Sequence, residues 1–301
     1  MIHLSSNAPR GFYTLKKTDS SGRSTSLSFE NLITDIGLNK LGTMSADDIV
    51  RNFYVGSGSA TPAFTDTNMN SLVGASSSIQ SDSEGTQIEV APYYVYLKKT
   101  VRFAVGAAAG NLSEVGVGWE SDPSGSLFSR ALIRDADGNP TSLTVLNDEY
   151  LDVTYELRIY PETSDVTGVV AIGGKDYQYI ARPGNLASTN TDGWSLGRSN
   201  TSVSKPWAYD GSLGAVTGLP SGNADDGAGA AVPYTSNSLQ ASVQQMWGLN
   251  DGNLGGVRSI RVYMGWSCWQ LQFSNTSDGS AIPKDTSNVL SFVLTHSWAR
   301  G

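Results

Sequence analysis

The alternation of apolar and polar residues is the strongest pattern in the chain. Residues 151–159 alternate without interruption, with every odd position apolar and every even position polar. Side chains of a strand point alternately to its two faces, so this segment is predicted to be a strand with one buried face. The pattern predicts a mainly β protein, because the same period of two recurs at residues 101–105, 115–119, 260–264, 269–273 and 290–298.

Glycine-containing turns are predicted between strands. Gly173-Gly174 separates the apolar runs 169–172 and 177–180, which is the pattern of a tight β-hairpin. The glycine-rich segment 54–62 is interpreted as a strand that ends in a turn. A phosphate-binding loop would need a further glycine or a lysine at spacings that this segment does not have.

Helical spacing is confined to two short segments. Apolar residues at intervals of three to five predict a helix over residues 29–42, with Ser28 as its N-cap and Gly42 at its end. A shorter helix is expected over residues 239–247, where Leu239, Val243, Met246 and Trp247 lie at helical spacing.

Composition sets the domain organisation. Charged residues make up 16% of the 301 residues and there are 33 glycines, a balance that favours turns and short strands over long surface helices. Residues 182–233 are rich in Gly, Ser, Asn and Asp and show no sustained period. We therefore expect an N-terminal β domain with the early helix over residues 1–183, and a C-terminal β domain with long loops over residues 184–301.

The two strand-rich blocks resemble each other in spacing. Val115 and Phe128 are 13 positions apart, as are Ile260 and Phe273. Further on, Leu143 and Leu151 correspond to Ile282 and Leu290 with one common offset, and the loop between is shorter in the second copy. The alternative is that any two alternating strands align at some offset. The predicted fold class is mainly β: two β-sandwich-like domains, with duplication as an open proposal, one or two short helices and long Gly/Ser/Asn-rich loops.

The charge balance argues against two classes of partner. Twenty Lys and Arg against 28 Asp and Glu give a net charge of −8, and no basic cluster offsets it. Nucleic acids and anionic membranes both require clustered basic side chains, so neither is expected. No segment approaches the roughly 18 apolar residues of a membrane span, and the first residues do not form a secretory signal.

Few residues could carry chemistry. The histidines are His3 and His296 and the single cysteine is Cys268, too few for a zinc site or a specific Ser-His-Asp set. His296 lies on the apolar side of a predicted strand, and Cys268 is expected to be a small core side chain. We expect no catalytic residues, no cofactor and no metal, and hence no enzyme.

Two acidic segments are candidate sites. Asp135-Ala136-Asp137-Gly138-Asn139 resembles a calcium loop, but its glycine is fourth rather than sixth and the twelfth position is Leu146. A hairpin turn is the favoured interpretation, with a calcium site of another kind as the alternative. Asp148 and Glu149 are adjacent, so they point to opposite sides in a strand and do not suit paired-carboxylate catalysis.

Three aromatic residues stand within the loop-rich segment. Trp194, Trp207 and Tyr209 are surrounded by Asn, Asp and Ser, which is a setting in which aromatic rings stack on sugars. The alternative is that the rings pack the loops onto a sheet or face a subunit interface, and it is the favoured one.

Several segments resemble a group of tailed-bacteriophage tail and tail-fibre-associated proteins. They are residues 29–38, 54–58, 62–67, 143–161 and 297–300. The resemblance implies a virion structural protein of the tail fibre, tail tip, baseplate or collar. It implies assembly with its own copies, as a trimer or hexamer, and with other phage virion proteins, and a contribution to host attachment. Such a protein is made in the host bacterial cytoplasm.

Two alternative functions stay open beside this one. One is a carbohydrate- or receptor-binding module, which would use Trp194 and Trp207 against a bacterial surface glycan. The other is a head decoration protein. A surface-polysaccharide depolymerase is disfavoured because no catalytic constellation can be assembled from the residues.

Overall fold

A computed structural model describes residues 1–190, 193–199 and 202–300. Within them the protein is mainly β, with twenty-one strands and two short helices. It forms two compact units. The N-terminal sandwich comprises residues 9–84, 96–159 and Arg300, and the C-terminal sandwich comprises residues 1–8, 85–95 and 160–299.

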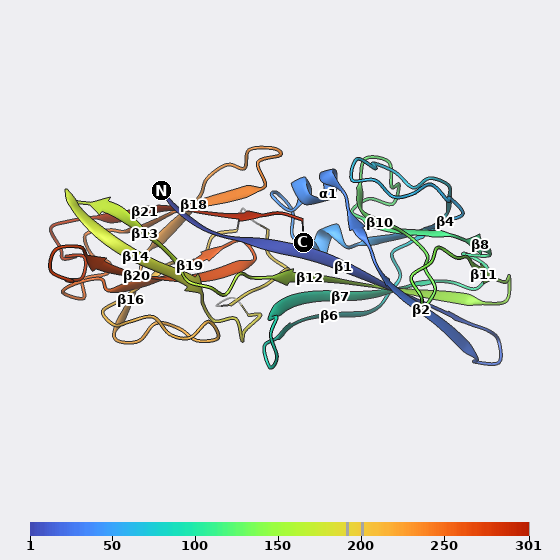
Figure 1. Cartoon of the computed structure of the whole chain (residues 1–301), viewed down its shortest axis with the longest axis horizontal. Helices are drawn as coiled ribbons and strands as arrows, with labels where there is room; N and C mark the ends of the chain where they lie inside the picture. Colours follow the sequence, from blue (N-terminus) through green and yellow to red (C-terminus); the bar gives the residue numbers. More distant parts are fainter. Residues whose placement is uncertain (191–192, 200–201, 301) are drawn as a thin grey trace. The chain divides into compact units, whose positions relative to one another are not determined.

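The N-terminal sandwich has two layers (Figure 1). One layer has the strand order β2-β1-β12-β7-β6, and the other has the order β3-β10-β9-β4-β5. Tyr13 and Phe128, from opposite layers, both pack on Tyr155, with ring centroids 4.9 and 6.3 Å away. The elements are β1 (Ile2–Thr18), β2 (Ser24–Glu30), β3 (Leu32–Ile33), α1 (Asp35–Lys40), α2 (Ala46–Ile49), β4 (Asn52–Gly56), β5 (Leu72–Ser76), β6 (Ile79–Gln87), β7 (Tyr94–Phe103), β8 (Gly110–Leu112), β9 (Glu114–Gly118), β10 (Leu127–Leu132), β11 (Leu143–Val145) and β12 (Tyr150–Tyr160).

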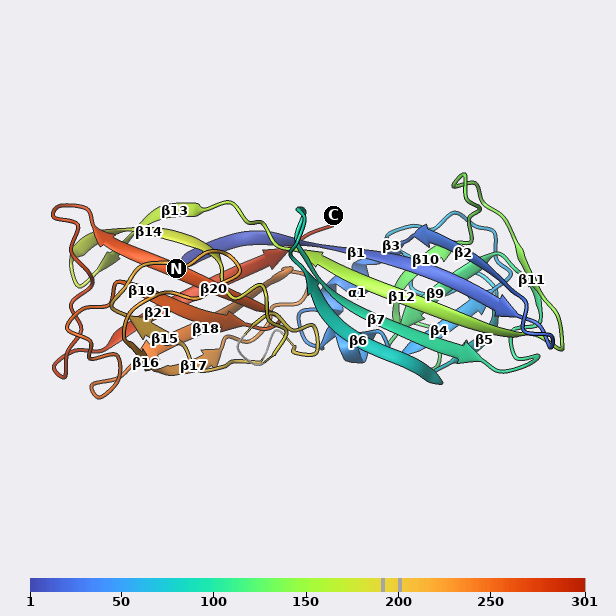
Figure 2. The same cartoon turned by 90° about the horizontal axis from the view of Figure 1, so that it is seen from below.

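The C-terminal sandwich also has two layers (Figure 2). A six-stranded sheet has the order β13-β14-β20-β19-β15-β16, and the facing layer has the order β17-β18-β21-β1. Phe273 of the first layer stacks on Phe292 of the second, with ring centroids 5.0 Å apart. The elements are β13 (Val166–Ile172), β14 (Lys175–Pro183), β15 (Trp207–Tyr209), β16 (Ala224–Asp226), β17 (Ala228–Ala231), β18 (Gln240–Trp247), β19 (Ser259–Met264), β20 (Ser267–Asn275) and β21 (Leu290–Trp298).

The expected division at residue 183/184 is not where the two units separate. Residues 160–183 belong to the C-terminal sandwich. The physical reason is that β14 pairs with β20 over seven residues, from Tyr177 opposite Asn275 to Pro183 opposite Trp269. The change of composition near residue 182 therefore marks the start of long loops inside one unit.

The two sandwiches share one strand order. The sheet order β3-β10-β9-β4-β5 corresponds to β14-β20-β19-β15-β16, and β1-β12-β7-β6 corresponds to β1-β21-β18-β17. A further short contact also recurs: Leu112 lies opposite Leu143 in one unit, and Val257 lies opposite Ile282 in the other. The shared order supports the proposal of an internal duplication.

The register corrects one detail of that proposal. Ala131 lies opposite Val115, whereas Leu271 lies opposite Ile260. Phe128 is 13 residues beyond Val115, and Phe273 is 13 residues beyond Ile260. The two phenylalanines nevertheless do not occupy equivalent positions in the two sandwiches. The connection between the paired strands is longer in the N-terminal sandwich, and this difference shifts the offset after the turn.

The strongest sequence patterns are confirmed. Strand β12 buries every odd position from Leu151 to Ile159 and leaves the even positions partly exposed. The predicted hairpin is the pair β13 and β14, and Ile172 lies opposite Lys175 across the two-residue turn. Gly173 and Gly174 have φ values of 57° and 77°, the left-handed conformation that this tight turn requires and that glycine adopts without strain.

The predicted helix over residues 29–42 is largely wrong. Only Asp35–Lys40 are helical, and the N-cap is Thr34, whose hydroxyl accepts a hydrogen bond from the backbone N–H of Gly37. Phe29 belongs to β2, which pairs with β1, and Leu32 belongs to β3, which pairs with β10. Strand pairing with distant segments overrides the local helical spacing. Neither helix in the described part of the chain is long and apolar enough to cross a membrane.

The second predicted helix is a strand. Residues Gln240–Trp247 form β18, which pairs with β21 over eight residues. Ala241, Val243, Gln245 and Trp247 are buried, while Met246 is exposed. The inward positions therefore follow a period of two, which the polar side chain of Gln245 disguises in the sequence.

Candidate functional site

The loop aromatics do not form an exposed platform. Trp194 is fully buried, its indole N–H donates to the Gly184 carbonyl at 3.1 Å, and it packs beside Trp269. Tyr209 is also buried. Trp207 is half-buried beside the guanidinium of Arg261. The sugar-stacking interpretation therefore does not hold for Trp194 and Tyr209, whose rings offer no face to a ligand.

His296 lies in a hydrogen-bonded core cluster. Its Nδ1 is 3.4 Å from the hydroxyl of Ser267, which donates to the Met264 carbonyl and accepts from the indole N–H of Trp269. Both His296 and Ser267 are fully buried, and so is Cys268. The hydroxyl is engaged and shielded from solvent, so the pair does not resemble an activated nucleophile.

Burial gives His296 a defined effect on stability. It lowers the pKa of the imidazole from 6.5 to about 3, because the charged ring would lose its hydration. The unfolded chain therefore takes up a proton first, and the folded state loses stability as pH falls below about 6.5. We expect the wild type to lose about 1.4 kcal/mol more per pH unit than His296→Gln between pH 6 and 4.

Urea unfolding of both proteins at pH 7, 6, 5 and 4 measures this difference. The variant is the control, because it retains the carboxylates that also titrate in acid. Parallel dependence of the two unfolding free energies on pH would contradict the assignment of a neutral, buried His296.

The most extensive charged cluster fixes a loop. Arg130 and Glu114 are buried in the N-terminal sandwich and form an ion pair at 2.7 Å, and Arg130 also contacts Asp66 at 2.7 Å. The guanidinium donates to the carbonyl of Ala60. The network holds the loop 57–71 between β4 and β5, because the Glu114 carboxylate accepts backbone N–H bonds from Gly58, Asn70 and Ser71.

The other acidic candidates are also structural. Asp135 accepts hydrogen bonds from the backbone N–H groups of Asp137 and Asn139, as a hairpin turn requires. Glu149 pairs with Lys17 at 3.1 Å, and its pKa is lowered first by the backbone N–H of Leu146 and then by Lys17. In the described ranges, no group of three or more His, Cys, Asp or Glu side chains could hold a metal ion.

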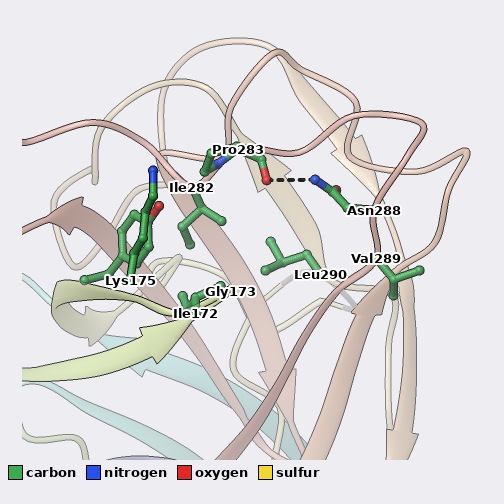
Figure 3. Close-up of a pocket in the computed structure, with 9 residues that line it drawn as sticks. Ile172, Gly173, Lys175, Ile282, Pro283, Asn288, Val289 and Leu290 are labelled. Atoms are coloured by element: carbon green, nitrogen blue, oxygen red, sulfur yellow. Dashed lines mark hydrogen bonds between the residues drawn. The ribbon is translucent and has the colours of Figure 1, made fainter.

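A cleft opens at the end of the β13–β14 hairpin (Figure 3). It comprises a pocket of about 230 Å³ and an adjoining one of about 400 Å³, which share Ile172, Gly173, Val289 and Leu290. Figure 3 shows Ile172, Ile282 and Leu290 around the first hollow. We call this the β13–β21 cleft, and its further lining residues are Met1, Ile2, Val170, Ala171, Lys175, Tyr177, Pro283, Asn288, Ser291, Phe292 and Val293.

Strand β13 borders this cleft and ends the six-stranded sheet. Its seven residues contain no charge and no proline, and they pair with β14 without a register shift. On this strand Val169 is 62% exposed, and Val289, which lines the cleft, is 54% exposed. An uncharged, apolar edge strand is a surface for strand pairing and apolar contact rather than for catalysis.

Sequence reasoning found the β13 hairpin but not its edge. No pattern in a single sequence states which strand is outermost. Edge strands are usually marked by lysine, proline or a bulge, and residues 166–172 contain no charge and no proline, so nothing in the sequence signals that this strand is an edge.

Comparison with known proteins gives no further guide to the site. No protein-family model, curated protein or solved structure matches this chain. The functional inference therefore rests on the residues and geometry described above.

Proposed function

We propose that the chain is a structural subunit of a tailed-bacteriophage virion, associated with the tail as part of a fibre, tail tip, baseplate or collar. The observation that carries this proposal is the open, uncharged edge of β13 with the β13–β21 cleft beside it. Neighbouring copies in an assembly would cover such a surface. The resemblance of residues 143–161 and the other quoted segments to tail proteins supplies the virion context.

The polar constellations agree with a structural role. The Arg130–Glu114 pair fixes a loop, and Lys17–Glu149 joins β1 to the turn before β12. The Ser267–His296 pair lies in the core. We therefore propose a protein that assembles with its own copies and other virion proteins, without catalytic activity.

Self-association is the first expected result. Light scattering behind size exclusion should give a mass well above 31.9 kDa, corresponding to a closed oligomer such as a trimer or hexamer. The physical reason is that pairing of exposed apolar edges buries surface from both partners. A monomer across the whole accessible concentration range would remove the main support for this function.

A further inference from the structure

We propose that β13 pairs antiparallel with β13 of a second copy, about a two-fold axis at Val169. The contact would join two six-stranded sheets edge to edge and close over the β13–β21 cleft. This inference rests on the proposed function and specifies the interface through which the copies assemble.

The hairpin itself defines the register. Ile172 and Lys175 close the two-residue turn and thus form a hydrogen-bonded pair. Backbone groups alternate in an antiparallel ladder, so Val166, Gly168, Val170 and Ile172 face β14. The N–H and C=O groups of Thr167, Val169 and Ala171 consequently point to the open edge.

Centring the axis on Val169 pairs these three residues with the same three residues of the second copy. Val169 then lies opposite Val169 of the second copy, and Thr167 lies opposite Ala171. Each such pair exchanges two backbone hydrogen bonds. The same register uses every outward backbone group of the strand.

The side chains on the other face are complementary in this register. Val166 meets Ile172 of the second copy, and Val170 meets Gly168. Gly168 leaves room for the valine, and a Cβ at this position would lie 2.6 Å from the Tyr179 hydroxyl, so a larger residue would have to displace that ring. Apolar cross-strand pairs of this kind stabilise an antiparallel contact.

The charges do not oppose the pairing of two identical strands. No charged residue lies between Val166 and Ile172, so the axis brings no like charges together. Asp165 precedes the strand and Lys175 follows its turn. Asp165 is paired with Arg182 of the same copy, and Lys175 is followed by Asp176, so neither end of the strand carries a net charge that opposes pairing.

The opposite edge of the same sheet is short and charged. Strand β16 has only three residues, Ala224–Asp226, and two of them are acidic. Charge and short length protect an edge against pairing. Within this sheet the long, uncharged edge is therefore β13, and a second copy is the occupant that its self-complementary pattern fits.

A cysteine pair tests the contact directly. Val169→Cys would place two cysteines opposite each other across the axis, with Cα atoms about 5.5 Å apart, which a disulfide can span. Gln178→Cys is the matched control, because Gln178 is exposed and lies directly opposite Val169 one strand inward. The native Cys268 is buried.

Under mild oxidation, Val169→Cys should form covalent dimers about tenfold faster than Gln178→Cys, since only its thiols are held at bonding distance. Equal rates for the two variants would overturn the proposal. An isologous pair also requires an even number of copies, so a wild-type assembly that is strictly trimeric would contradict it.

Charge variants test the register. Thr167→Lys with Ala171→Lys places two like pairs across the axis and should dissociate the contact. Thr167→Lys with Ala171→Glu places opposite charges together and should retain it. All these side chains are exposed, so the changes leave the core intact.

The mass of the assembly distinguishes the possible failures. A wild-type oligomer whose mass is unchanged in both double variants would place the interface elsewhere and leave the proposed function standing. A wild-type monomer that also fails to crosslink through Val169→Cys would overturn both proposals.

Discussion

Arg130→Met is expected to lower the free energy of unfolding by about 3–5 kcal/mol, because it leaves the buried carboxylate of Glu114 without its cation. The two side chains are 2% and 0% exposed. The backbone N–H bonds from the loop 57–71 only partly compensate the remaining charge. Urea unfolding measures the loss, and faster proteolytic cleavage within residues 57–71 should accompany it.

Two controls separate charge from packing. Combining Arg130→Met with Glu114→Gln removes the uncompensated charge, so the double variant should be more stable than Arg130→Met alone. Arg134→Met should change stability by less than about 1 kcal/mol, because Arg134 is partly exposed and donates only to a nearby carbonyl, that of Gly138. A loss under 1 kcal/mol for Arg130→Met would contradict a stabilising role for the network.

The sequence predicted the strands well where one face alone is buried. Strand β12 is recognisable because its inward and outward positions differ in polarity at every step. Strand β20 was recognisable only in part, because all positions from Ser267 to Leu271 are buried and include both Gln270 and Trp269. When loops cover the outer face of a sheet, polarity no longer reports which way a side chain points.

The predicted helices failed for a related reason. Spacings of three and four arise by chance in a short strand when one inward position is polar, as Gln245 is in β18. At residues 32–33, partners more than ninety positions away decide the outcome: Ser129 pairs with Ile33 and Arg130 with Leu32. Local periodicity carries no information about such partners.

The charged network and the open edge could not be predicted from the sequence. Glu114 and Arg130 appear as ordinary polar positions of adjacent strands, and only the folded chain brings the loop 57–71 over them. The shared strand order shows that β3, with two paired residues, stands where β14 has seven. Two copies of a duplicated fold can therefore carry strands of different length at the same place in the sheet. The spacing of residues along the sequence does not show this difference.

Phe292→Ala is expected to lower the free energy of unfolding by about 3–5 kcal/mol, because it opens a cavity between the two layers of the C-terminal sandwich. Phe292 is 5% exposed, stacks on Phe273 at an interplanar angle of 9° and meets Trp247 edge-on at 6.3 Å. Urea unfolding at a fixed protein concentration is the appropriate measurement, since self-association would otherwise add to the apparent stability.

A double-mutant cycle with Phe273→Ala shows whether the two rings act together. The structure places them on facing sheets, so the first substitution removes the partner of the second. The double variant should then lose less than the sum of the single losses, by about 0.5–1.5 kcal/mol for the aromatic pair. Strict additivity would mean that β20 and β21 do not face each other across this core, and the two-layer arrangement would then require another contact to hold it.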